Sequence, residues 1–249
     1  MSSPSSMKAS TTAYSLNKQE KTIGDRKVAE LWRNLMVDRA KILNAVNTAI
    51  EKAPKRKFSE SIDITINLKN IDMAQPKNRI DETIMLPHGT GEKIGICVIG
   101  KGDIVTQAKD AKVDLIIGPE EVERLGGQPR EARKVAGKYR YFLAEMAVMP
   151  GVGRYLGPRL GPRGRMPMPI PAQQDIRPIV ERLRNSVKIR TKDKTVFSTK
   201  VGTTAMKPEQ VAENIETIVK RIEAVLEQGP LNVRSIFVKT TMGPAVRLE

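Results

Sequence analysis

The pattern of apolar positions predicts a helix followed by a strand in the first third of the chain. From Met36 onward, apolar residues recur at helical spacing until Pro54 ends the pattern; they are Ile42, Leu43, Val46, Ala49 and Ile50. Residues 61–68 then alternate strictly between apolar and polar side chains, and the apolar set comprises Ile62, Ile64, Ile66 and Leu68. This alternation is typical of a half-buried strand with one polar face.

The middle of the chain carries a different pattern. Continuous apolar runs occur here, and they cover residues 94–99, 113–117 and 141–148. Such runs are typical of strands that are buried on both faces of a parallel sheet. Helical stretches separate the runs, starting at Asp103, at Pro119 and at Arg130. These features predict a small, Rossmann-like α/β domain with three layers.

A segment rich in glycine and proline follows, at residues 151–171. It contains five glycines and five prolines. Because glycine is conformationally free and proline lacks an amide donor, this spacing predicts no regular element. Residues 151–169 are therefore expected to form a hinge.

Alternating strands return near the C-terminus, in residues 187–190, 195–201 and 232–239. They surround a helix predicted over residues 208–228, whose buried face comprises Val211, Ile215, Ile218, Val219, Ile222 and Val225. Half-buried strands thus occur both before and after the doubly buried ones.

The simplest organisation is a discontinuous domain interrupted by an insertion. Residues 36–79 and 170–249 are expected to form one α+β domain, with an antiparallel sheet and helices. Residues 80–169 are expected to form the inserted α/β domain, including the hinge. Residues 1–35 begin with a stretch rich in serine and threonine and are predicted to be a partly disordered N-terminal extension.

The distribution of charge agrees with this division. The whole chain carries a formal net charge of +15, with 43 lysines and arginines against 28 acidic residues. By segment, the net charge is +7 for residues 1–80, −1 for 81–150, +4 for 151–169 and +5 for 170–249. A basic surface confined to the outer domain indicates a polyanion site there, and nucleic acid is favoured over a membrane surface or an acidic protein.

Composition narrows the kind of recognition and the compartment. Four tyrosines, four phenylalanines and one tryptophan are too few for a wall of stacking aromatics, so recognition through backbone and shape is expected. No apolar run approaches the roughly 18 residues that span a bilayer, and no secretory signal is evident at the start. The sequence therefore predicts a cytoplasmic protein that does not insert into membranes.

The sequence gives little support for a catalytic site or a cofactor site. Cys97 lies within an apolar run and is predicted to be a buried, unreactive thiol, while His88 is the only histidine, so neither a catalytic triad nor a metal cluster is expected. The turn Gly100-Lys101-Gly102 resembles that of a dinucleotide-binding fold, but the third glycine is missing. A flexible turn is favoured over a nucleotide site, and no cofactor is predicted.

Three features are candidates for RNA contact, each with an ordinary structural alternative. The predicted hinge contains four arginines and no acid, which suits either phosphate contact or a charged linker; they are Arg154, Arg159, Arg163 and Arg165. Phe58, before the first strand, either caps the core or stacks on a nucleotide. The turn at residues 240–244 either simply ends a strand or brings hydroxyls and a glycine backbone close to RNA.

Taken together, these segments resemble the ribosomal protein L-one family, in its archaeal type. The resemblance extends from about Met36 to the C-terminus. Its most specific parts are residues 153–167, with the run Leu160-Gly161-Pro162-Arg163-Gly164-Arg165-Met166-Pro167, and the terminal Thr241-Met242-Gly243-Pro244. Leu86-Pro87-His88-Gly89 and Phe58-Ser59-Glu60 also match.

The resemblance implies a noncatalytic protein of the mobile side stalk of the large ribosomal subunit, present there as a monomer. Its implied partners are large-subunit ribosomal RNA, deacylated tRNA leaving the exit site, and the mRNA of its own operon, whose translation many members repress. The positions that match the family's RNA contacts are Phe58, Glu60, Ser61, Asp63, Thr65, Ser235, Thr241, Met242 and Gly243.

Some alternatives stay open at this point. Residues 1–35 depart from the archaeal pattern, which is explained either by a basic extension or by translation starting at Met36. A nucleotide-dependent enzyme built on the insertion is the second hypothesis for function. A free-standing RNA chaperone or processing factor of the same fold is the third.

Overall fold

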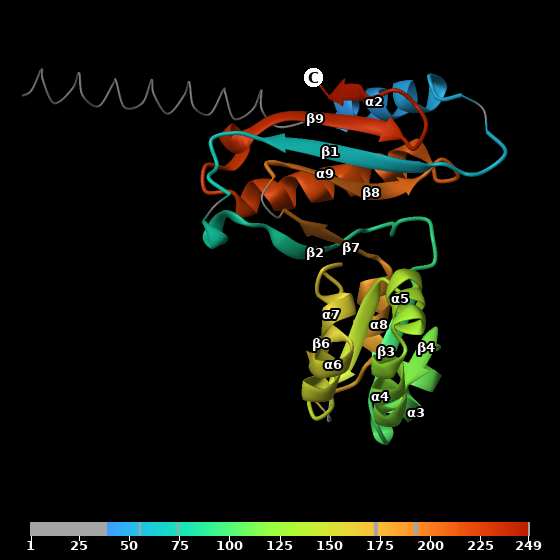
Figure 1. The fold of residues 1–249 in the computed structure, drawn as a ribbon. Helices are drawn as coiled ribbons and strands as arrows, with labels where there is room; N and C mark the ends of the chain where they lie inside the picture. Colours follow the sequence, from blue (N-terminus) through green and yellow to red (C-terminus); the bar gives the residue numbers. More distant parts are fainter. Residues whose placement is uncertain (1–38, 55, 74, 172–173, 192–193, 249) are drawn as a thin grey trace, which may run out of the picture.

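The computed structural model describes residues 39–54, 56–73, 75–171, 174–191 and 194–248. Within them the chain forms two packed units, and its described ends both belong to the upper unit of Figure 1. The mixed α/β structure expected from the sequence is confirmed. The predicted extension of residues 1–35 and the predicted helix start at Met36 lie outside the described residues.

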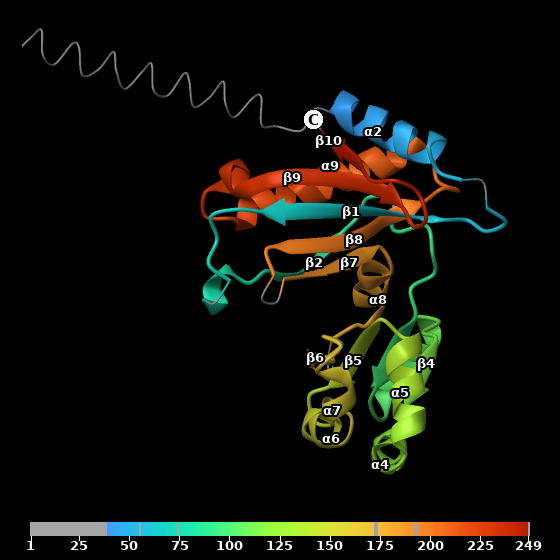
Figure 2. The ribbon, with the colours of Figure 1, turned by 45° about the horizontal axis from the view of Figure 1, so that its top comes forward.

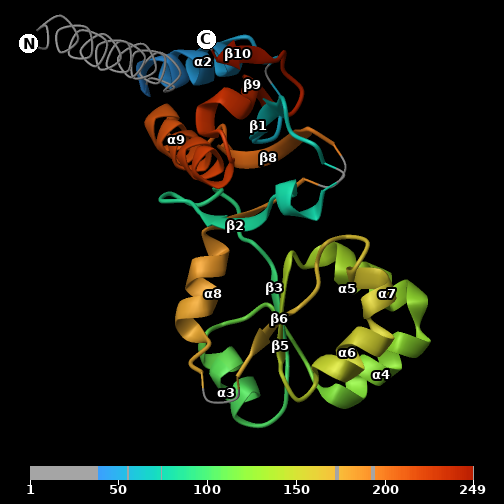
Figure 3. The same cartoon turned by 90° about the vertical axis from the view of Figure 1, so that its left-hand side faces the viewer.

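The upper unit, called the antiparallel unit here, is built on a four-stranded sheet. Strand β1 (Ser61–Leu68) pairs antiparallel with β8 (Val196–Thr203) on one side and with β9 (Val233–Thr240) on the other. Strand β10 (Val246–Leu248) extends the sheet beyond β9. Helices α2 (Arg39–Glu51) and α9 (Pro208–Val225) lie on one side of this sheet, as Figure 3 shows.

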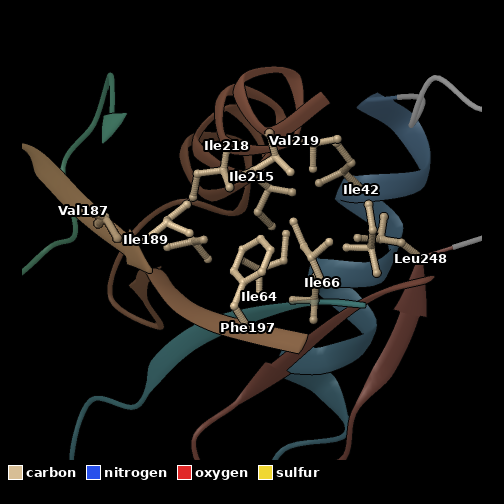
Figure 4. Packing of buried hydrophobic residues seen from close by; sticks show 14 of the residues in the cluster. Ile42, Ile64, Ile66, Val187, Ile189, Phe197, Ile215, Ile218, Val219 and Leu248 are labelled. Atoms are coloured by element: carbon tan, nitrogen blue, oxygen red, sulfur yellow. The ribbon is translucent and has the colours of Figure 1, made fainter. Parts of the chain in front are cut away.

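The apolar alternation of β1 places its side chains toward these helices. Ile62, Ile64, Ile66 and Leu68 are buried, and they pack in one cluster with residues of both helices, including Ile42 and Ile215 (Figure 4). The predicted strand and the buried faces of both helices are confirmed. Val225 is an exception: α9 ends at this residue, earlier than the predicted Gln228, and its side chain stays exposed.

A two-stranded ribbon also belongs to the antiparallel unit. Strand β2 (Asp81–Met85) pairs antiparallel with β7 (Ser186–Arg190), and Ile84 and Ile189 join the same core. The expected domain boundary at residue 80 would assign β2 to the inserted domain, whereas in the structure β2 belongs to the antiparallel unit. No local pattern indicates this, because the partner of β2 lies about a hundred residues away. Two short 3₁₀ helices, Pro76–Asn78 and Gly229–Asn232, connect elements of this unit.

The lower unit, called the parallel unit, is built on a four-stranded parallel sheet. Its strands lie in the order β4 (Leu115–Ile117), β3 (Ile96–Ile99), β5 (Tyr141–Glu145) and β6 (Met168–Ile170). Helices flank the sheet on both sides in Figure 3. They are α3 (Asp103–Asp110) and α8 (Arg177–Arg184) on one face, and α4 (Pro119–Gly127), α5 (Pro129–Lys138), α6 (Met149–Tyr155) and α7 (Gly157–Leu160) on the other.

The doubly buried runs of the sequence are explained by these three layers. Along β3, Ile96 and Val98 pack with α3 and α8, whereas Cys97 and Ile99 pack with the helices of the opposite face. The predicted parallel strands and the helices that begin near Asp103, Pro119 and Arg130 are confirmed. Cys97 is buried as predicted.

The expectation that residues 151–169 form an irregular hinge is wrong. They contain most of α6, the whole of α7 and the start of β6. Proline is tolerated in the first turn of a helix, where its missing N–H has no intrahelical partner, and both short helices have a proline there. Val152, Leu156 and Leu160 recur at helical spacing and are buried against the sheet, which holds these glycine-rich turns in place.

The second expected boundary, at residue 170, also differs from the structure. Ile170, Val180 and Leu183 pack in the core of the parallel unit, so β6 and α8 belong to it. The chain returns to the antiparallel unit only at β7. Residues 170–184 hold three basic and two acidic side chains, so their charge does not assign them to either unit.

Candidate nucleic-acid interface

The face of the antiparallel sheet opposite α2 and α9 is polar, and no helix of the described chain covers it. This surface, called the open face, is formed by β10, β9, β1 and β8. In Figure 1, β1 passes in front of α9, and Figure 2 shows the same sheet from a different angle. Its polar side chains are joined across strands. The Thr65 hydroxyl lies 3.2 Å from that of Ser198, and Asn67 Nδ2 donates to Ser235 Oγ at 2.8 Å.

Asp63 lies in the centre of the open face. Its partners in the neighbouring strands are Lys200 on β8 and Lys239 on β9. Burial raises the pKa of the Asp63 carboxyl, and the two lysines act in the opposite direction. The Asp63 carboxylate lies between these two lysines, which come from the strands on either side of β1, and it offsets part of their positive charge.

The turn after β9 is held against the start of β1 by a compact set of hydrogen bonds. The amide of Thr241 donates to the carbonyl of Ser61 at 3.0 Å, and the amide of Ser61 donates to the Thr241 hydroxyl at 3.2 Å. The Gly243 amide donates to the hydroxyl of buried Thr240 at 3.0 Å. A Cβ at Gly243 would meet that hydroxyl and Ala53, so this position requires glycine.

Glu60 anchors the same turn from below the surface. Its side chain is only 4% exposed, and Oε2 accepts a hydrogen bond from the Met242 amide at 3.2 Å. The Glu60 amide in turn donates to the Thr204 hydroxyl at 3.1 Å. The Glu60 carboxylate therefore holds the turn in this structure, and a direct contact of Glu60 with RNA stays a prediction.

Two large apolar side chains project at this end of the open face. Phe58 is 58% exposed and Met242 is 57% exposed, and Glu60 lies between their segments. Phe58 therefore does not cap the core. Exposed apolar groups beside hydroxyls and lysines suit contact with the faces of riboses or bases.

The four arginines of the predicted hinge lie in the parallel unit, away from this face. Arg165 Nη1 donates to the carbonyls of Ala136, Gly137 and Tyr139 at the end of α5, which favours a cation there. Arg163 Nη1 donates to the Arg133 carbonyl at 3.4 Å, and the Arg154 guanidinium lies 5.8 Å from the ring of Tyr155. Arg159 is partly buried in α7.

Comparison with known sequences decides the family. Residues 49–244, well over half of the chain, match the profile of the Ribosomal protein L1p/L10e family. The chain belongs to this family. The resemblance seen in the sequence is thereby confirmed, and all the candidate contact residues lie within the matched range.

Archaeal members of the family are similar to the chain over most of its length. The large ribosomal subunit protein uL1 of Methanoregula boonei is 86% identical over 213 residues, which are 86% of this chain and 100% of the relative. The proteins of that name from Methanoculleus marisnigri and Archaeoglobus fulgidus are 71% and 46% identical, with the same coverage. These names denote ribosomal proteins and not enzymes.

A side chain already occupies the place of a phosphate at the turn Gly100-Lys101-Gly102, which resembles that of a dinucleotide-binding fold. Glu145 Oε2 accepts a hydrogen bond from the Lys101 amide at 3.0 Å, in front of the first turn of α3. A carboxylate there takes the place of a phosphate and repels one. His88 pairs with Glu213 at 2.5 Å, and the described residues contain no group of acidic, histidine or cysteine side chains fit for a metal.

The structure adds residues to the open face that the sequence analysis did not select. Ser198 and Lys200 come from β8, Phe237 and Lys239 from β9, and Arg247 from β10. The alternation of residues 195–201 and 232–239 already distinguishes the polar face of each strand from its core face. The sequence therefore contained a signal for the four added residues of β8 and β9. Strand β10 was not predicted, and nothing indicated Arg247. No helix in the described part of the chain is long and apolar enough to cross a membrane.

Proposed function

We propose that the protein is a structural constituent of the large ribosomal subunit and that its open face binds large-subunit ribosomal RNA. The observation that carries this proposal is the meeting of two segments that are far apart in the chain. Residues 58–65 and 235–243 form one surface, in which a hydrogen-bonded turn packs beside the first strand. Membership of the family and the names of the archaeal relatives support it.

The chemistry of the open face suits structured RNA. The hydroxyls of Ser61 and Thr65 can donate to and accept from ribose 2′-hydroxyls, which distinguish RNA from DNA. Lys239 and Arg247 supply positive charge for phosphates, and Phe58 and Met242 supply apolar contact at one end. Glu60 contributes indirectly by fixing the turn that carries Met242 and Gly243.

The finer roles follow from the same surface. In this proposal the antiparallel unit attaches the protein to ribosomal RNA as a monomer, and the parallel unit extends outward as part of the mobile side stalk that releases deacylated tRNA from the exit site. An mRNA segment that imitates the ribosomal RNA site would bind the same open face. Repression of the protein's own operon would then be relieved whenever free ribosomal RNA competes for it.

Substitution of exposed methionines tests the site directly. Met242→Ala removes an exposed contact without breaking the hydrogen bonds of the turn, whereas Thr241→Ala also removes bonds to Ser61. Met242→Ala should weaken binding of large-subunit ribosomal RNA by on the order of 1 to 3 kcal/mol in filter-binding or calorimetric titrations. Met146→Ala is the matched control, because this methionine is 60% exposed on the parallel unit.

Lys101→Ala is a second control, and it should alter binding little. Equal losses from Met242→Ala, Met146→Ala and Lys101→Ala would refute the assignment of the site. Failure of the native protein to sediment with large subunits at high salt would refute the ribosomal role itself.

A further inference from the structure

A cavity of about 230 Å³ lies where the two units meet. From the antiparallel unit it is lined by β7 at Ser186 and Val187 and by Lys200 of β8. From the parallel unit it is lined by the segment around the end of α5, at Lys138 and Arg140, and by Arg165. This cavity, called the cleft here, is separate from the turn at residues 240–244.

The lining of the cleft is strongly basic. Among the residues that the structure describes, five cationic side chains line the cleft and Glu92 is the one carboxylate. Glu92 pairs with Lys200 at 2.5 Å, and Lys93 is paired with Asp114, outside the cleft, at 2.8 Å. Lys138, Arg140 and Arg165 have no carboxylate partner among the described residues.

Arg165 lines the cleft and is held there through one nitrogen of its guanidinium group. Its hydrogen bonds within the described chain all use Nη1, which is held by carbonyls at the end of α5. Burial lowers the pKa of Arg165, and the neighbouring positive charges of Arg140 and Arg163 lower it further. Mutual repulsion of guanidinium groups with no counter-ion is relieved when an anion binds between them.

We propose that the cleft is a second anion site, which binds a phosphate group between Arg140, Arg165 and Lys138. A phosphate suits this lining because guanidinium groups donate to it in pairs, while the lysine adds a further positive charge. The cavity is larger than a phosphate ion, so a phosphate ester also fits. Two sources share this chemistry: a free phosphate compound and the phosphodiester backbone of RNA.

Occupancy of the cleft would join the two units, because its cationic lining comes mainly from the parallel unit and its opposite wall from β7 and β8. This site does not depend on ribosomal RNA binding at the open face. The proposal that the cleft binds phosphate can therefore be confirmed or refuted independently of the function proposed above.

The test compares Arg140→Ala with Arg130→Ala in the full-length protein. Arg140 is exposed and its backbone amide bond to Gly95 survives the substitution, whereas Arg130 is an exposed arginine at the other end of α5 that does not line the cleft. Both variants lose one positive charge. Calorimetric titration with inorganic phosphate and with pyrophosphate provides the first readout, and the salt dependence of binding to large-subunit ribosomal RNA provides the second.

For a free phosphate compound, Arg140→Ala should bind inorganic phosphate or pyrophosphate about tenfold more weakly than Arg130→Ala and wild type. For an RNA phosphate, these titrations show no binding, and Arg140→Ala lowers the slope of log K against log salt by about one relative to Arg130→Ala. Either result supports the site. Indistinguishable behaviour of the two variants in both measurements overturns it, whatever Met242→Ala does to RNA affinity.

Discussion

At the scale of single residues, two carboxylates at or beneath the open face serve the fold. Asp63 separates two lysines on neighbouring strands, and Glu60 uses its carboxylate to hold a backbone amide of the turn. Both would look out of place on a surface that binds a polyanion. Their positions show that the open face is built by local electrostatic balance and not by positive charge alone.

The titration of Asp63 gives a prediction with a definite sign. Burial raises its pKa above the ordinary value of 3.8, with Lys239 and Lys200 opposing the shift, so the folded protein favours the protonated form more than the unfolded chain does. Stability from this residue is present below pH 3.8 and is lost as the pH rises through the folded pKa. Asp63→Asn should remove this component, as measured by urea midpoints between pH 3 and 6.

Asp114 provides a control of opposite sign. Burial alone would raise its pKa, but the hydrogen bonds from Lys93 and from the Ile96 amide bring it below 3.8. Its contribution is therefore present above pH 3.8 and lost as the pH falls through the folded pKa. Asp114→Asn should reduce the loss of stability at acid pH in the plot of urea midpoint against pH. If Asp63→Asn leaves that plot unchanged, burial of Asp63 is not the cause of the expected pH dependence.

The residues that could be predicted from the sequence are those whose neighbours along the chain define their environment. Alternation alone placed Ser61, Asp63 and Thr65 on the polar side of β1, and the apolar run placed Cys97 in a core. The role of Glu60 could not be predicted in this way, because its partner Met242 lies 182 residues later. The carbonyls that hold Arg165 likewise become available only where α5 ends.

At the scale of elements, α9 does more than cover the sheet. Asn214 on its buried side is fully inaccessible, and its Nδ2 donates to the carbonyls of Gly89 and Val201 at 2.8 and 2.9 Å. Its Oδ1 accepts from the His88 amide at 3.2 Å. The helix thereby fixes the segment that leads from β2 toward the parallel unit.

Removing this amide should destabilise the antiparallel unit. Asn214→Ala leaves one backbone amide and two carbonyls without their partner, so a loss on the order of 3 kcal/mol is expected in urea unfolding. Thr217→Ala is a suitable control on the same helix, because within the described residues its hydroxyl bonds only to the Glu213 carbonyl one turn away. A similar loss of stability for both variants would show that the hydrogen bonds of Asn214 to His88, Gly89 and Val201 contribute no more than a local helix contact.

Elements with a long periodic pattern were predictable, and short ones that depend on packing were not. Strand β1 and helix α9 carry enough regular positions to be recognised alone. Strand β2 and helix α8 become regular only against a distant β7 and a parallel sheet, respectively. In α6 and α7, proline and glycine obscured an apolar stripe that tertiary contacts stabilise.

At the scale of the whole molecule, two separate cores predict two separately unfolding units. The antiparallel core and the two clusters of the parallel unit share no buried residue. Cys97 reports on the second unit, because burial, with a smaller effect of Glu121, raises its pKa to about 12 and the side chain is inaccessible. At pH 8 the native thiol should resist Ellman's reagent until the parallel unit opens.

Core truncations distinguish independent from joint unfolding. Leu143→Ala, in the parallel unit, should cost roughly 2 to 5 kcal/mol and speed the labelling of Cys97 by more than about tenfold. Ile218→Ala, in the antiparallel core, should cost a similar amount but leave the labelling rate nearly unchanged. Equal acceleration by both substitutions would mean that the chain unfolds as one cooperative body.

The position of β1 at the centre of its sheet also affects how the protein is made. Both neighbours of β1 come from residues 196–240, so this strand leaves the ribosome long before either partner exists. The parallel unit, which is contiguous in sequence, can fold while the chain is still being synthesised. The open face, by contrast, is completed only when the last strands emerge. Under the function proposed above, a nascent or truncated chain therefore cannot compete with a finished molecule for RNA.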